Sequence, residues 1–249
     1  MAAESTRRLA AALLACAFAT GCAHSTYGDP ALPVAGKVLG TVVHTRDAEE
    51  LRYVVLRELT DRYAQEQGIA VTQAEKDAYV RCVREGLAKD RAQKAARRAE
   101  LAGRLTAAGL SDAERSRLAA EVASLDDFIA ALGDLGAAKA DPQEEEARQL
   151  VAAAFILQWK INRALYKQYG GRIIFQQGGP EPLDAYHRFL EEAQSRGDFR
   201  IVDKTLEAAF WRYYRDDSIH SFYRSGSNEE ARAFAVAPWQ PAGTGGGPR

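Results

Sequence analysis

The chain of 249 residues is poor in cysteine and lacks the short motifs by which many enzymes are recognised. Its three cysteines, Cys16, Cys22 and Cys82, are not paired at the spacing of a metal or redox site. It has no Walker loop, no dinucleotide-binding glycine pattern and no G-x-S-x-G elbow. We therefore expect no catalytic residue, no cofactor and no metal, and the sequence predicts that the protein is not an enzyme.

An excess of one charge is also missing. The 33 Lys and Arg residues nearly balance 34 Asp and Glu residues, which excludes the strongly basic composition typical of proteins that bind nucleic acid. A hydrophobic content of 47% with 27% charged residues is enough for a folded core. The length favours one domain with additions, or two small domains.

What the amino terminus does contain is a secretion signal. Arg7 and Arg8 precede an apolar run, Leu9 to Phe18, which is too short for the ~20 residues of a membrane span. The run ends in Phe18-Ala19-Thr20-Gly21-Cys22, which resembles the lipobox of bacterial lipoproteins. The resemblance implies a signal peptide over residues 1–21 and a mature chain that begins at an acylated Cys22. Ordinary cleavage with a spare thiol is the alternative.

This reading has consequences for location, charge and thiols. Ala23 is not the aspartate that retains lipoproteins at the inner membrane of enteric bacteria, so the resemblance favours the periplasmic face of the outer membrane. Removing Arg7, Arg8 and Glu4 leaves 31 basic and 33 acidic residues, a formal charge of −2. Cys82 becomes the one mature thiol besides the anchor. Its flanking residues place it on the apolar side of a helix, and we expect it to be buried; an exposed thiol open to intermolecular bridging is the alternative.

Residues 22–35 contain two prolines and little periodicity, and we expect them to form a tether of up to about 40 Å. The short β-branched segment Lys37–His44 is the best strand candidate of this half. A helix follows Asp47 and stops near Gly68, and the next begins at the capping box formed by Thr72 and Glu75.

A helical hairpin is expected over residues 87–132. The chain breaks at Gly109, directly before a second capping box made by Ser111 and Glu114. An apolar stripe on the second arm advances by four and three residues and should face Leu101 and Leu105 on the first arm; it consists of Leu118, Val122, Leu125, Ile129 and Leu132. The basic residues of the first arm, from Lys89 to Arg98, are expected to form a solvated face.

Residues 133–146 read as a loop, followed by a helix over Ala147–Tyr169 that is apolar almost all round and should be central. A second strand candidate, Arg172–Gln176, is expected to pair with Val38–Val43 in a two-stranded ribbon. Helices should follow at Leu183–Gln194, Asp203–Tyr214 and Glu229–Phe234. Residues 179–237 form an aromatic-rich helical segment, and residues 238–249 a disordered tail.

Only one cluster invites a catalytic or metal-binding interpretation. Asp216, Asp217, Ser218 and His220 bring acid, hydroxyl and imidazole within five residues. Members of a catalytic triad usually converge from separate loops, so turn and capping roles are the preferred interpretation. Cys82 lacks an evident base, and Gly133-Asp-Leu-Gly136 echoes a prolyl-isomerase turn without the domain that such an enzyme needs.

The segment "VLGTVV", followed by "ELRYVVLRELTDRYAQEQGIAVTQAEKDAYV", resembles the amino-terminal chaperone domain of SurA-type and PpiD-type periplasmic folding factors. The shared features are Tyr63-Ala64, Gly68-Ile69 and the capped helix at Thr72-x-x-Glu75. About fifty residues match well, and Trp159–Phe175 matches more loosely. The isomerase domain of these factors is absent. The resemblance implies a mostly α fold, with a SurA-like domain over residues 36–178 that includes the hairpin.

The resemblance further implies a lipid-anchored holdase that binds unfolded or nascent exported polypeptides through apolar helical surfaces. The alternative is an adaptor lipoprotein whose hairpin docks to an envelope complex; a hydrolase using His220 is a third possibility. Candidate partner-binding residues are apolar side chains of the hairpin stripe and of the aromatic-rich end: Leu118, Val122, Leu125, Ile129, Phe210, Tyr213, Tyr214 and Phe222.

Overall fold

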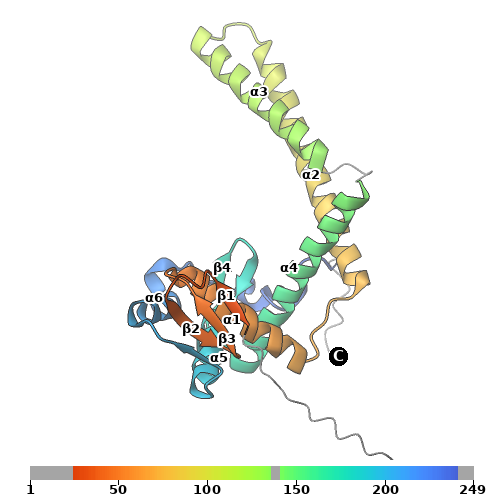
Figure 1. The fold of residues 1–249 in the computed structure, drawn as a ribbon. Helices are drawn as coiled ribbons and strands as arrows, with labels where there is room; N and C mark the ends of the chain where they lie inside the picture. Colours follow the sequence, from red (N-terminus) through yellow and green to blue (C-terminus); the bar gives the residue numbers. More distant parts are fainter. Residues whose placement is uncertain (1–24, 136–140, 241–249) are drawn as a thin grey trace, which may run out of the picture.

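The computed structural model describes residues 25–135 and 141–240, and it is mostly helical with a small mixed sheet (Figure 1). The expected signal peptide, Cys22 and the end of the tail from residue 241 lie outside the described residues. The elements in chain order are β1 (Thr26–Gly28), β2 (Val34–Val38), β3 (Thr41–His44), α1 (Ala48–Glu66), α2 (Gln73–Leu105), α3 (Asp112–Leu135), α4 (Pro142–Tyr169), β4 (Ile174–Gln176), β5 (Gly179–Glu181), α5 (Leu183–Ser195), β6 (Phe199–Ile201), α6 (Lys204–Arg215), the 3-10 turn η1 (Asp217–Ile219) and α7 (Asn228–Arg232).

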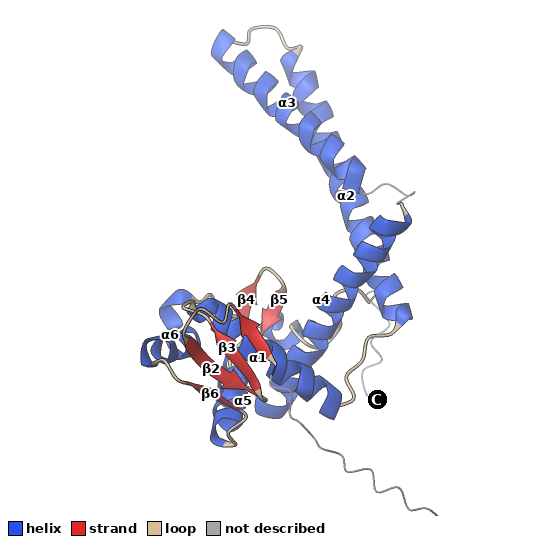
Figure 2. Ribbon diagram, in the orientation of Figure 1, coloured by secondary structure: helices blue, strands red, loops and turns tan. Residues whose placement is uncertain are grey.

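A body and an arm make up the molecule. In the body, a four-stranded sheet of order β1-β3-β2-β6 packs with helices α1, α5 and α6, and the arm is the hairpin of α2 and α3, which projects away from it (Figures 1 and 2). Helix α4 crosses α2 at the base of the arm and runs back into the body. The arm is therefore extended, not folded back over the body.

One hydrophobic core spans the body. It unites side chains from before residue 178, such as Val54 and Leu165, with Leu190 and Phe210 from after it. The expected domain boundary at residue 178 therefore does not separate two cores. A second cluster joins Trp159 on α4 to Phe234, Ala237 and Trp239. Trp239 is only 5% exposed, so the expected tail does not begin at residue 238.

The strand predictions need correction. Lys37–His44 is not one strand but a hairpin, because Leu39 and Gly40 both take left-handed backbone angles (φ 46° and 93°) and reverse the chain. The expected ribbon between Val38–Val43 and Arg172–Gln176 is wrong. Strand β2 pairs instead with β6, and β4 pairs with β5 in a separate hairpin.

The tether expected over residues 22–35 is also wrong for most of its length. Strand β1 pairs in parallel with β3, and β2 already begins at Val34. The backbone carbonyl of Ser25 accepts a 2.9 Å hydrogen bond from the Val42 N–H, so the first described residue is already attached to the sheet.

Helix starts were predicted well where the signal is local. Asp47 accepts backbone N–H bonds at the start of α1, and the capping boxes at Thr72 and Ser111 form as expected. Helix α4 begins five residues earlier than expected, because Asp141 caps it and Pro142 occupies its first position.

Candidate binding groove between α2 and α4

The cluster near His220 takes part in capping and in an ion pair. Asp216 caps η1 and accepts from both the backbone N–H and the hydroxyl of Ser218, while Asp217 pairs with Arg172 at 2.6 Å. The Nε2 atom of His220 lies 2.6 Å from the carbonyl oxygen of Tyr213. The hydroxyl is therefore engaged by a capping carboxylate and not by the imidazole. Within residues 25–135 and 141–240, no group of three or more His, Cys, Asp or Glu residues is placed to hold a metal ion.

The aromatic partner-binding candidates belong largely to the core. Phe210 and Tyr214 are 0% and 3% exposed, so neither can contact a partner in the folded protein. Tyr213 is partly buried; Arg52 lies over its ring at 3.9 Å, and its hydroxyl lies 3.1 Å from Glu181. Phe222 is also partly buried and packs against the core.

Burial also affects the ionisation of Glu181. It disfavours the charged carboxylate and raises its pKa above the ordinary 4.5, although the Tyr213 hydroxyl and the nearby Arg52 act in the opposite direction.

The hairpin candidates face the other arm. Leu118 is 2% exposed, and Val122, Leu125 and Ile129 are partly buried, as expected for a seam between α2 and α3. Ion pairs flank this seam, between Arg97 and Glu121 at 3.2 Å and between Arg98 and Asp126 at 2.9 Å.

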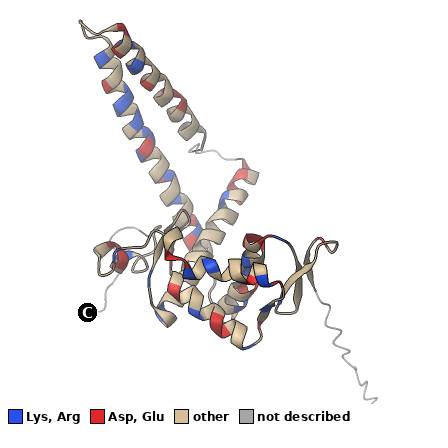
Figure 3. Cartoon of the chain, turned by 90° about the vertical axis from the view of Figure 1, so that its left-hand side faces the viewer, with Lys and Arg blue, Asp and Glu red and all other residues tan. Residues whose placement is uncertain are grey.

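These pairs neutralise part of the basic face of α2. Basic and acidic residues are interleaved along the arm (Figure 3). The arm therefore presents a mixed charged surface and not an anion-binding stripe.

A largely apolar hollow lies where α2 crosses α4. It has a volume of about 450 Å³ and is lined by Tyr79, Val80, Val83, Arg84 and Leu87 of α2 and by Ala147, Arg148 and Val151 of α4. Val83 is 45% exposed and Val151 is 52% exposed. Further apolar side chains on α4 are also open to solvent, with Leu150 at 66% and Phe155 at 41%. We call this feature the α2–α4 groove.

Polar contacts hold the two helices at this crossing. Glu75, the capping residue of α2, pairs with Lys160 of α4 at 2.5 Å, and Lys160 also donates to the carbonyl of Ala70 at 2.6 Å. Partial burial opposes ionisation of Glu75, but hydrogen bonds from Lys160 and Thr72 outweigh it and lower the pKa of this carboxyl.

Aromatic rings pack beside the groove. Tyr79 stacks on Phe155 with ring centroids 5.9 Å apart, and it also contacts Trp239 at 5.9 Å. Trp239 in turn meets Trp159 edge-on at 5.4 Å. The carboxy-terminal segment thus contacts Tyr79, one of the residues that line the groove. Burial raises the pKa of the Tyr79 hydroxyl. At the rim, Arg84 lies 3.7 Å from Glu145, which balances its charge.

Sequence reasoning missed this groove. It expected α4 to be covered on several sides and Cys82 to be buried, whereas Leu150 and Val151 are open and Cys82 is exposed. The signal that could have revealed it is that α4 is apolar on almost every face. When too few other elements pack against such a helix, one apolar face stays exposed to solvent.

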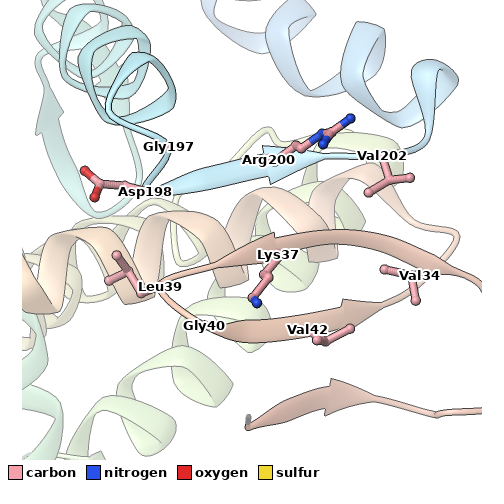
Figure 4. Close-up of a pocket in the computed structure, with 9 residues that line it drawn as sticks. All are labelled: Val34, Lys37, Leu39, Gly40, Val42, Gly197, Asp198, Arg200 and Val202. Atoms are coloured by element: carbon pink, nitrogen blue, oxygen red, sulfur yellow. The ribbon is translucent and has the colours of Figure 1, made fainter. Parts of the chain in front are cut away.

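A second hollow, of about 600 Å³, lies on the outer face of the sheet and includes Val34, Lys37, Arg200 and Val202 (Figure 4).

In the part of the chain that the structure describes, no helix is both long and apolar enough to cross a membrane. Compared with known proteins, the chain matches no family model, no curated protein and no solved structure. The assignment of a function therefore rests on the geometry of these surfaces.

Proposed function

We propose that this chain is a lipid-anchored, chaperone-like holdase that binds apolar segments of unfolded exported polypeptides in the α2–α4 groove. The observation that carries the proposal is a set of half-exposed apolar side chains: Val83 and Val151 line the groove, and Phe155 lies beside it. The resemblance of the amino-terminal segment to SurA-type chaperone domains supports it. The anchor would be the acyl chains on Cys22, at the periplasmic face of the outer membrane.

The size of the exposed surface is suited to reversible binding. Full burial of a Val or Phe side chain contributes ~1.5–3 kcal/mol, and these residues are already about half covered. Three such side chains would then contribute about 3 kcal/mol, which alone is weaker than the ~4 kcal/mol of a millimolar complex. A client held by several weak contacts can leave without an energy source, as a holdase outside the cytoplasm requires.

The adaptor alternative has less support. Its docking stripe, which begins at Leu118, is turned toward α2 in the seam of the hairpin. Polar substitutions there would open the hairpin, so they could not separate loss of docking from loss of folding.

The test is suppression of aggregation. We expect the purified mature chain to keep several unrelated unfolded proteins soluble at a near-stoichiometric ratio, and Val83→Glu with Val151→Glu to weaken this effect by roughly tenfold or more. The matched control is Ala88→Glu with Ala92→Glu, which adds the same charge at exposed positions of α2. Failure of the parent chain to protect any client, or equal loss in both variants, would sink the proposal.

A further inference from the structure

The outer face of the sheet carries an unusual row of side chains. The strand registers align Thr26 with Val42, Val42 with Lys37, and Lys37 with Arg200, so one row crosses all four strands. Lys37 and Arg200 are exposed, whereas the residues beside them along the strands, such as Val38 and Phe199, point into the core. Lys37 and Arg200 are therefore paired in register on one open sheet face. In Figure 4 the Lys37 side chain extends toward β3, and the Arg200 side chain extends along β6 toward Val202.

The register places two like charges on neighbouring strands. Like charges directly opposite each other on neighbouring strands destabilise a sheet. Neither Lys37 nor Arg200 forms an ion pair with another of the described residues. The carboxylate in the same hollow, Asp198, is already held by Arg62 at 2.9 Å and by Arg196 at 2.9 Å. An anionic partner outside the described chain would relieve the repulsion.

The cations are framed by apolar side chains. Val34 is 43% exposed and Val202 is 54% exposed, and both line the hollow together with Val42 and Leu39. A surface with cations at its centre and short apolar side chains around them suits the boundary between lipid headgroups and acyl chains.

The position of Cys22 brings this face close to a bilayer. Ser25 is attached to β3 by its backbone bond to Val42 and by a 2.6 Å hydrogen bond between its hydroxyl and that of Thr41. Only three residue steps separate Cys22 from Ser25, which span about 10 Å at full extension. Strands β2 and β6 lie two and three strand spacings from β1, about 10 and 15 Å.

We propose that the outer face of the sheet lies against an anionic lipid surface, with Lys37 and Arg200 over the headgroups. This inference rests on the lipid anchor of the proposed function, but not on the α2–α4 groove. The anchor brings the sheet to the membrane, and the two cations orient it, since charges within about 10 Å of an anionic surface feel its potential. The arm then projects from a body fixed in orientation.

Vesicle binding tests the surface without the anchor. We take residues 22–249 with Cys22→Ser, which retains every described residue, and measure co-sedimentation at low salt with phosphatidylcholine vesicles containing or lacking phosphatidylglycerol. We expect binding to the anionic vesicles alone. The variant Lys37→Glu with Arg200→Glu should bind at least roughly 30-fold less well, because each cation near such a surface contributes about fivefold and each new carboxylate is repelled.

Three comparisons make the result decisive. The control Lys89→Glu with Arg91→Glu changes the net charge equally on the arm and should lose less than threefold. The single variant Lys37→Glu places opposite charges across the strands, so it should stay folded and still bind less well. The sheet variants should suppress client aggregation as the parent does, which separates this inference from the holdase.

Other outcomes would overturn the inference. Equal loss in the arm control would mean that net charge alone matters, and no preference for phosphatidylglycerol would exclude a headgroup site. A concentration-dependent dimer that Lys37→Glu with Arg200→Glu abolishes would assign the face to a second copy of the chain. Mass spectrometry that finds Cys22 unmodified in the native protein would remove the anchor, whatever the vesicles show.

Discussion

The hairpin arm should unfold separately from the body, and Leu101→Ala tests this. Leu101 is completely buried, yet it belongs to neither hydrophobic cluster of the body. The pairs of Arg97 with Glu121 and Arg98 with Asp126 place it level with the turn between Leu118 and Val122 on α3. Among the described residues of this outer seam, Leu101, Leu118 and Leu132 are the buried side chains.

The magnitude follows from this small core. A buried Leu→Ala substitution costs about 2–5 kcal/mol, and a seam open to solvent on its sides can partly collapse, so we take about 2–3 kcal/mol. Burial of the three seam leucines stabilises the arm by ~1.5–3 kcal/mol each, before the loss of chain entropy on folding is subtracted. The substitution therefore removes much of the free energy that holds the arm together. If the arm opens locally, amide protection should fall by roughly 30- to 150-fold there.

Native-state hydrogen exchange measures this directly. Protection should drop in residues 95–130 and remain at the parent level in α1 and α6. Phe210→Ala, in the core of the body, serves as the contrasting variant and should lower protection in the body. A uniform loss of protection across arm and body in Leu101→Ala would refute the idea that the arm is a separate cooperative unit.

Three further predictions concern charged groups of the body. Asp198→Asn should destabilise the fold by about 1–3 kcal/mol in urea melts at pH 7, because it removes the partly buried ion pair between Asp198 and Arg62. Hydrogen bonding to Arg62 lowers the pKa of Asp198, so the stability from this pair is present above the ordinary pKa of 3.8 and is lost as pH falls through the lowered value. The stability difference between parent and variant should therefore shrink in acid, and a difference that stays constant as pH falls would contradict this. Burial raises the pKa of Glu181, so its effect on stability depends on pH in the opposite direction: its contribution is fully present below about pH 4.5 and is lost as pH rises. Glu181→Gln should therefore be more stable than the parent at pH 7, and its urea midpoint should change less between pH 4 and 8. Lys37→Glu should raise stability by roughly 0.2–1 kcal/mol, as it converts a cross-strand repulsion with Arg200 into an attraction, and a fall in the thermal midpoint would contradict that assignment.

Local signals were readable from the sequence, and distant pairings were not. The capping boxes at Thr72 and Ser111 depend on residues three positions apart, so their chemistry is visible in the sequence. Strand β6 has only three residues, and it becomes a strand because β2 lies beside it. Nothing within Phe199–Ile201 itself distinguishes it from a loop.

The candidate site illustrates the same difference. Phe210 and Tyr214 read equally well as a binding surface or as a core, since periodicity identifies an apolar face but not its neighbour. For α4, an apolar circumference was taken to mean full coverage, although α2 and the carboxy-terminal segment cover only part of it. The groove is what remains uncovered.

The pairing of β2 with β6 also constrains the order in which the chain can fold. As the chain emerges during synthesis from its amino terminus, β1, β2 and β3 can associate early, but the outer edge of β2 stays unpaired until residues 199–201 have emerged. More than 150 residues separate the two strands, whereas the hairpin arm between them closes through local contacts alone. A chain interrupted before residue 199 would thus display an open strand edge, the kind of surface on which aggregation begins.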